Sequence, residues 1–116
     1  MPIDEKSETE ILQLVNPIMD NLMEASTRID HARHTRDFTE RLKAIVTEDY
    51  LKKVCTKYQS ERGYLGERKF AALFRRPGAV AVIWKQGFTK QPGEYVAEAL
   101  FVDQDGRYLV DHVFVW

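Results

Sequence analysis

The sequence predicts an α+β fold in which three N-terminal helices pack on a C-terminal four-stranded antiparallel sheet. Before residue 63, apolar residues recur at spacings of three and four, which is typical of helices with one buried face. After residue 66 the spacing changes to two, which is typical of strands. Turn signals at 77–78, 89–93 and 104–106 divide this second half into four consecutive strands. We therefore expect a meander of strands within one domain covering residues 1–116.

The composition is that of an ordinary globular domain. The chain has 116 residues, of which 44% are hydrophobic and 30% charged, so it can bury a core without disulfides or a structural metal. A formal net charge of −1 favours neither nucleic acid nor an anionic membrane as a partner. The N-terminal segment is acidic and lacks the apolar run of a signal peptide. We expect a cytoplasmic protein with no membrane contact and no cofactor.

The first helix begins with a capping-box sequence, in which Ser7 is followed three residues later by Glu10. Residues 1–6 before this sequence are mostly polar and are expected to be disordered. Pro17 lies inside the first apolar-periodic run and has no backbone N–H to donate. We expect it to kink the helix or to divide it in two.

Weaker helical signals follow. The charged stretch 28–43 has sparse apolar residues and predicts a short helix at 30–37 and another at 39–46, with a salt-bridged surface. Thr47 and the two acidic residues after it are a stronger start signal, since acids are favourable at a helix N-terminus. Gly63 is expected to end this last helix.

The predicted strands cover 68–76, 79–88, 94–103 and 107–116. We interpret the connecting turns as loops of two, five and three residues. These lengths place Ala71, Trp84, Glu98 and His112 in one row across one face of the sheet. A slip of one residue in any hairpin would destroy this row.

Both faces of the predicted sheet are apolar, although the helices can cover only one of them. An apolar face left open to water favours association, and a second copy of the chain is the simplest partner. We therefore predict a homodimer through the sheet. The predicted interface residues are Phe70, Phe74, Ile83, Ala97 and Phe101.

A pocket is predicted around the row of polar side chains. A carboxylate paired with an imidazole beside Trp84 could serve as a general base or bind the polar group of a small ligand. The alternative is a structural ion pair whose partners satisfy each other. Asp111 should point to the opposite face and meet an Arg or Lys, or lie at an interface, rather than form a dyad with His112. The predicted pocket residues are Trp84, Glu98, Leu100, Val110 and His112, with Glu98 and His112 as catalytic candidates.

The histidines and the single cysteine are further candidates for a functional site. His31 and His34 have a spacing that can place two imidazoles on one metal, but no third ligand completes a recognised signature. We interpret them as part of a solvated helix face and predict no metal site. Cys55 is the only cysteine, and we interpret it as a small buried hydrophobic residue.

The element order resembles that of the nuclear-transport-factor-2-like superfamily, to which ketosteroid isomerase and scytalone dehydratase belong. The segments that carry the resemblance are ILQLVNPIMDNLM, TEDYLKKV, AVAVIWKQGF and YLVDHVFVW, and it covers residues 9–116. The ending is similar to the final strands of small bacterial members of unknown function. The resemblance implies a curved sheet wrapped on helices into a cone, with a pocket at the open end and frequent dimerisation across the sheet.

The resemblance does not imply a reaction, because this fold carries enzymes, binding modules and scaffolds alike. No residue here matches the catalytic set of ketosteroid isomerase position by position. We therefore interpret the protein as a small non-enzymatic domain that binds an apolar ligand or a protein partner. The alternatives are an isomerase or lyase with Glu98 or His112 as the base, and a subunit or assembly factor of a larger complex.

Overall fold

The computed structural model describes all 116 residues. It contains four α-helices, and the two short helices predicted at 30–37 and 39–46 are both present in addition to the two longer ones. None of these helices is long and apolar enough to cross a membrane. The helices are α1 (Glu8–Arg28), α2 (His31–His34), α3 (Glu40–Ile45) and α4 (Glu48–Arg62), and a short 3-10 helix η1 (Ile3–Glu5) precedes them.

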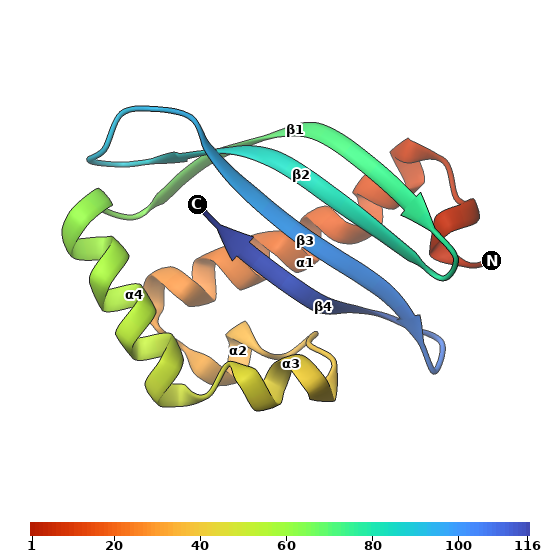
Figure 1. The fold of residues 1–116 in the computed structure, drawn as a ribbon, viewed down its shortest axis with the longest axis horizontal. Coiled ribbons are helices and arrows are strands. Elements are labelled where there is room, and N and C mark those ends of the chain that lie inside the picture. The colour runs from red at the N-terminus through yellow and green to blue at the C-terminus, as the bar shows by residue number, and fades with distance from the viewer.

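The predicted four-stranded meander is confirmed. Neighbouring strands are antiparallel and follow one another in the order β1-β2-β3-β4. α1 runs along one side of the sheet, whereas the side that faces the viewer in Figure 1 carries no helix. The strands are β1 (Leu65–Arg76), β2 (Ala79–Phe88), β3 (Tyr95–Gln104) and β4 (Arg107–Val115).

α1 is a single helix of 21 residues that begins where the capping box predicts. The side chain of Ser7 accepts from the Glu10 backbone N–H, and the Glu10 side chain accepts from the Ser7 backbone N–H. Pro17 does not divide the helix. Both Pro17 and Gln13, whose carbonyl loses its usual partner, are exposed. Water can therefore satisfy that carbonyl, and the helix continues through the proline.

Residues 1–6, for which the sequence predicts disorder, include the short helix η1 and make several contacts with the sheet. The side chain of Ile3 is completely buried. Its backbone N–H donates to the Asp103 carboxylate at 2.8 Å, and Arg75 donates to the backbone carbonyls of Asp4 and Lys6. The segment is thereby tied to the far end of the sheet, through partners that lie more than 60 positions away in the sequence and leave no local signal.

The register differs from the predicted one between β2 and β3. Trp84 pairs with Ala97 and Ile83 pairs with Glu98, one residue away from the prediction. The reason is that Gly87 and Phe88 extend β2 alongside β1 but not alongside β3, so the connection to β3 is longer than five residues. Because side chains alternate along a strand, this slip moves Trp84 to the face opposite Glu98.

The register between β3 and β4 also differs from the predicted one, because the turn is shorter and β4 contains a bulge. Asp105 and Gly106 form a two-residue turn with positive φ angles of 52° and 77°, and Gln104 pairs with Arg107. A register shift at Asp111 then adds one more residue to β4. The two displacements add up to two residues, so Glu98 and His112 remain on one face even though Glu98 pairs with Phe114.

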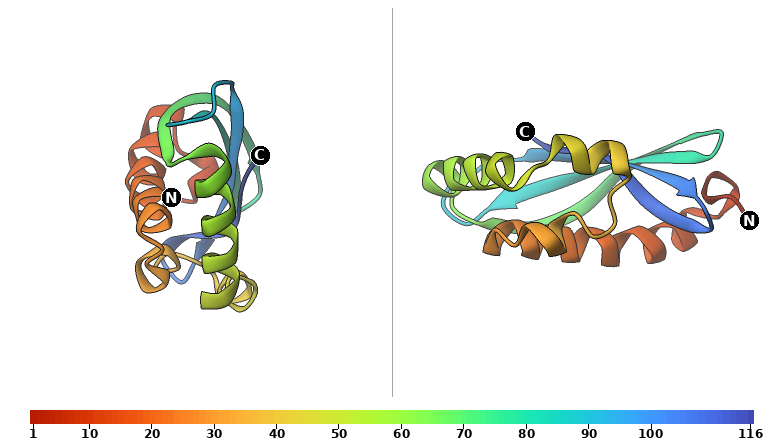
Figure 2. Two further views of the ribbon diagram at one scale, coloured as in Figure 1. Left: turned by 90° about the vertical axis from the view of Figure 1, so that its left-hand side faces the viewer. Right: turned by 90° about the horizontal axis from the view of Figure 1, so that it is seen from below.

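The helices cover one face of the sheet and leave the other open. Figure 2 shows α1 lying along one side of the strands and α4 lying at one end of the molecule. The covered face supplies the core from β2, β3 and β4, and it meets the buried face of α1. The sheet side chains in this core are Val80, Val82, Trp84, Ala97, Ala99, Phe101 and Val110.

Gly63 ends α4 as predicted, and its conformation excludes a side chain. Its φ of 85° and ψ of −150° are a combination that only glycine adopts readily. A Cβ here would lie 2.4 Å from Thr89 Oγ1. This close approach lets Thr89 accept from the Tyr64 backbone N–H and join the end of α4 to the β2–β3 loop.

We expect Gly63→Ala to lower the free energy of unfolding by about 1.5 kcal/mol or more, because it adds backbone strain and a clash. Urea unfolding followed by circular dichroism measures the change. Gly66→Ala is the matched control, since its Cβ would meet nothing closer than 3.5 Å. Equal losses in the two variants would contradict the assignment of strain to Gly63.

Candidate functional site

A cavity of about 320 Å³ lies between the helices and the C-terminal half of β4. Its wall is mainly apolar, with 15 hydrophobic residues among 20. α1 and α4 supply the apolar side chains at its base, and the end of the sheet closes another side. The apolar wall includes Leu22, Met23, Leu42, Leu51, Val54, Leu65, Phe88, Val113 and Val115.

Three polar side chains meet in the wall where α1 passes α4. Ser26 Oγ lies 2.7 Å from the Tyr58 hydroxyl and 3.3 Å from Cys55 Sγ. Burial raises the pKa of the Cys55 thiol and of the Tyr58 hydroxyl, and hydrogen bonds from Ser26 offset only part of this effect. Both groups are therefore neutral at physiological pH, and Cys55 is buried as predicted.

His34 also lines the cavity and is the least satisfied polar group there. Only 8% of the residue is exposed, and its Nδ1 is buried without a hydrogen-bond partner. Phe38 packs against the ring edge-on, with centroids 5.3 Å apart. Burial, with a smaller contribution from the charge of His31, lowers the pKa of His34 to about 4. The ring is therefore neutral at pH 7, and its Nδ1 stays buried and unpaired beside the apolar wall.

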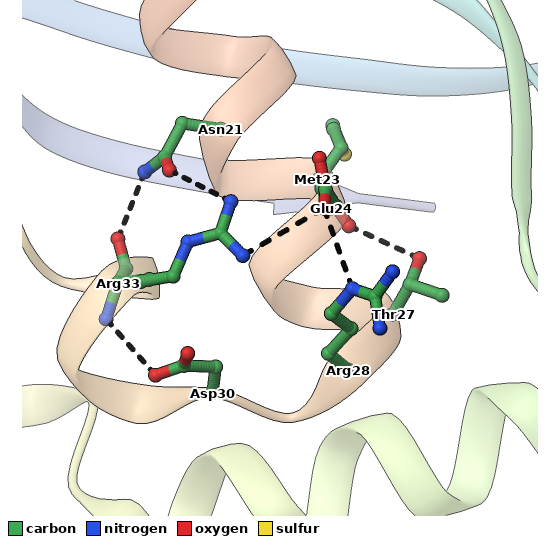
Figure 3. A network of polar contacts seen from close by, with 7 residues as sticks. All are labelled: Asn21, Met23, Glu24, Thr27, Arg28, Asp30 and Arg33. Atoms are coloured by element: carbon green, nitrogen blue, oxygen red, sulfur yellow. Dashed lines mark hydrogen bonds and ion pairs between the residues drawn. The ribbon is translucent and has the colours of Figure 1, made fainter.

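The position of His34 is fixed by a network between α1 and α2 (Figure 3). The Asn21 amide donates to the Arg33 carbonyl at 2.9 Å, and the Arg33 guanidinium reaches back to Asn21 and Glu24. Asp30 caps α2 by accepting from the Arg33 backbone N–H. These contacts hold the single turn of α2 against α1, and the next residue along the chain is His34.

The side chains of His31 and His34, the two candidate metal ligands, lie in different environments. His31 Nε2 lies 2.8 Å from the Val46 carbonyl, whereas His34 lines the cavity. His34 is not on a solvated face, which corrects that interpretation. The helix begins at His31 and lies between α1 and α3, so its two histidines meet separate parts of the fold.

Asp111 meets an arginine, as predicted. Its Oδ1 accepts from Thr39 Oγ1 at 2.7 Å and from Arg41 Nε at 3.1 Å, and Arg41 also donates to the Asp111 carbonyl. Burial raises the pKa of Asp111, but these hydrogen bonds and the charge of Arg41 outweigh it and lower the pKa below its usual value. The bulge at Asp111 thus ties α3 to β4 at the rim of the cavity.

The predicted pocket residues do not form one site. Trp84 and Val110 are buried in the core on the covered face. Glu98 and Leu100 lie on the open face, because of the register slip between β2 and β3. His112 lies on the open face beside Glu98, and it also reaches the edge of the cavity.

Glu98 and His112 nevertheless pair, on the open face. His112 Nε2 and Trp116 Nε1 each lie 2.8 Å from an oxygen of the Glu98 carboxylate. The Trp116 hydrogen bond, followed by the His112 hydrogen bond, holds the pKa of Glu98 below its usual value against the opposing effect of burial. A carboxylate with a lowered pKa is a weaker base, so this arrangement fits the structural alternative better than catalysis.

The predicted interface residues do not all lie on the open face of the sheet. Ala97 and Phe101 are completely buried under the helices, so they cannot form an interface on the open face. Phe74 is 58% exposed and lies opposite Ala81 at the edge of that face, while Ile83 lies near its centre. Phe70 pairs with Trp84 beside a bulge in the edge strand β1 and is 37% exposed.

Several residues of the cavity were not predicted as a site. Ser26, Tyr58 and Arg62 come from helices, whereas the predicted pocket residues all come from the sheet. One signal was present, since Leu51, Cys55 and Tyr58 share a helix face that also includes Arg62. A basic residue that continues an apolar helix face indicates that this end of the face is not packed in the hydrophobic core.

Comparisons place the architecture among solved structures of low sequence identity. The Rd1NTF2_05 variant has a TM-score of 0.62 at 10% identity, and the match covers 88% of this chain and 96% of that chain. An NTF-2 like protein of unknown function from Shewanella oneidensis MR-1 has a TM-score of 0.54 at 15% identity, covering 89% and 96%. A DUF4783 family protein from Bacteroides uniformis has a TM-score of 0.52 at 10% identity, covering 83% and 93%.

No protein-family model and no curated protein matches the sequence. At such low identities the matches establish an architecture and not an activity. The resemblance in element order is confirmed at the level of the fold. The chain therefore has the nuclear-transport-factor-2-like fold.

Proposed function

We propose that this protein binds a small, largely apolar ligand in the cavity between α1, α4 and β4. The observation that carries the proposal is the cavity itself, whose wall has 15 hydrophobic residues among 20 and includes His34, a residue with an unpaired buried Nδ1. A buried polar atom without a partner costs about 1–3 kcal/mol, and a ligand hydroxyl or amide would remove that cost. The volume of about 320 Å³ is at the lower end of the range of small-molecule sites, roughly 300–1,000 Å³.

A titration with 1-octanol tests this proposal, because octanol is neutral and has one hydroxyl on an apolar chain. We expect saturable shifts of backbone amide signals in two-dimensional NMR spectra at Cys55, Tyr58 and Val113, whose side chains line the cavity. The amides of Ala81 and Ile83 on the open face are the internal control. Saturation without shifts at the three cavity residues, or shifts confined to the open face, would contradict the proposal.

A second proposal concerns the open face, which we propose to be covered by a second copy of the chain. Three large aromatic residues near it are more than half exposed: Phe74 at 58%, Phe114 at 53% and Trp116 at 57%. Large apolar side chains that are exposed in this way favour association. The polar groups at its centre already satisfy one another within the chain, so burying them costs less than burying unpaired groups.

The two alternatives receive less support. A base at Glu98 or His112 would need an enclosed site, whereas this pair is partly exposed and Glu98 has a lowered pKa. A subunit of a larger complex would use the same open face for a different chain. Measurement of the mass of the isolated protein separates that alternative from the homodimer, because only the homodimer forms without a partner.

A further inference from the structure

The cavity wall contains basic side chains but no acidic ones. Eighteen residues of the chain are acidic, yet no Asp or Glu is among the 20 residues that line the cavity. The wall does contain four side chains that can carry positive charge. These are His34, Arg41, Arg62 and His112. A wall of this kind is electrostatically complementary to an anionic ligand and excludes a cationic one.

Only one of the two arginines is without a compensating charge. Arg41 is engaged by Asp111, through both the carboxylate and the backbone carbonyl. The guanidinium of Arg62 makes no ion pair and no hydrogen bond within the chain. His34 is neutral at pH 7, as described above. Arg62 is therefore the unneutralised charge in the cavity wall.

Arg62 is also held in place by aromatic rings. Its guanidinium carbon lies 4.9 Å from the centre of the Tyr95 ring and 5.5 Å from that of Phe88, and the two rings pack edge-to-face. Such stacking positions the guanidinium plane without using its five N–H donors. The donors remain available to a ligand, and little side-chain freedom has to be lost when they bind it.

We propose that the ligand is an amphipathic carboxylate, whose carboxylate accepts hydrogen bonds from Arg62 while its apolar body fills the cavity. This inference rests on the ligand-binding function proposed above and specifies its chemical class. An arginine fork matches a carboxylate through two parallel hydrogen bonds, which are stronger than bonds between neutral groups. The many apolar residues of the wall supply the contact for the hydrocarbon part of the ligand.

The cavity also sets the size of this ligand. At about 30 Å³ for each water-sized group, a volume of about 320 Å³ holds roughly ten such groups. A medium-chain fatty acid such as octanoate has this size. Octanamide has the same shape and the same number of heavy atoms, but it carries no charge, so the pair isolates the contribution of the carboxylate.

Titrations of the protein with octanoate and octanamide, followed by the same NMR signals, test the inference. We expect octanoate to bind at least tenfold more tightly than octanamide. Arg62→Gln should abolish this preference and leave octanamide binding within about twofold, because the substitution removes the charged guanidinium that a carboxylate prefers and leaves the apolar wall unchanged. Arg62→Lys should retain part of the preference. Arg76→Gln is the control, since Arg76 is exposed and does not line the cavity.

The outcomes separate this inference from the proposed function. If octanol and octanamide bind in the cavity but octanoate binds no more tightly, the carboxylate assignment is wrong and ligand binding stands. A preference for octanoate that survives in Arg62→Gln also overturns the assignment, and so does an equal loss in Arg76→Gln. If none of the three compounds shifts the cavity signals, both the inference and the proposed function are wrong.

Discussion

Phe114→Glu is expected to convert a homodimer of this protein into monomers. Phe114 is 53% exposed and pairs with Glu98 on the open face. Burying a phenylalanine side chain contributes roughly 2 kcal/mol, and a twofold-symmetric interface contains it twice. We therefore expect the dissociation constant to rise roughly a thousandfold, which corresponds to about 4 kcal/mol. Light scattering coupled to size-exclusion chromatography measures the mass directly.

Tyr64→Glu is the matched control for this experiment. Tyr64 is 52% exposed, like Phe114, but it lies between α4 and β1, away from the open face. Its substitution introduces the same charge and should leave the mass unchanged. A native protein that is monomeric at micromolar concentration would contradict the homodimer and favour a different partner for the open face. Dimers that persist in Phe114→Glu would place the interface elsewhere.

The parts of the fold that local chemistry specifies could be predicted from the sequence. Ser7 and Thr47 both cap helices where their positions predict, because an N-cap depends on a few adjacent residues. The four strands likewise lie within a few residues of the predicted ranges. Each of these features depends on neighbours in the sequence, and so each leaves a local signal.

The register could not be predicted in the same way, because it depends on where pairing stops. Gly87 and Phe88 look like the end of a strand from the sequence, and they do pair with β1 but not with β3. The bulge at Asp111 has no glycine to indicate it, and the arginine that Asp111 contacts there, Arg41, is 70 positions away. One slipped residue was enough to place Trp84 and Glu98 on opposite faces.

The candidate site was missed for a related reason. The environment of His34 combines α1, α2, α4 and β4, so its burial depends on contacts that span most of the chain. The sequence shows two histidines on a charged helix, a pattern that is typical of a solvated surface. The network through Asn21 and Arg33 turns this short helix toward the core, and nothing in the local sequence indicates that it does so.

The burial of His34 has a consequence that can be measured without a ligand. Because the pKa falls from an ordinary 6.5 to about 4 on folding, the unfolded chain binds more protons than the folded protein between these values. The stabilising contribution of neutral His34 is complete above pH 6.5 and is lost as the pH falls toward 4. By linkage we expect the free energy of unfolding to decrease by about 2 kcal/mol between pH 7 and pH 5.

Between pH 7 and pH 5 the carboxylates with lowered pKa values contribute little to the change in the free energy of unfolding, so the change reports mainly on His34. Glu10, Glu98 and Asp111 have ordinary values of 4.5, 4.5 and 3.8, so their contribution to stability is lost mainly below pH 5. His34→Gln keeps a polar side chain without a titrating proton, and it should flatten the stability profile between pH 7 and pH 5 in urea unfolding. The Cε1 proton of His34 should titrate by NMR with a midpoint near 4. A midpoint near 6.5, or an unchanged slope in the variant, would mean that water reaches the ring and that the cavity does not enclose it.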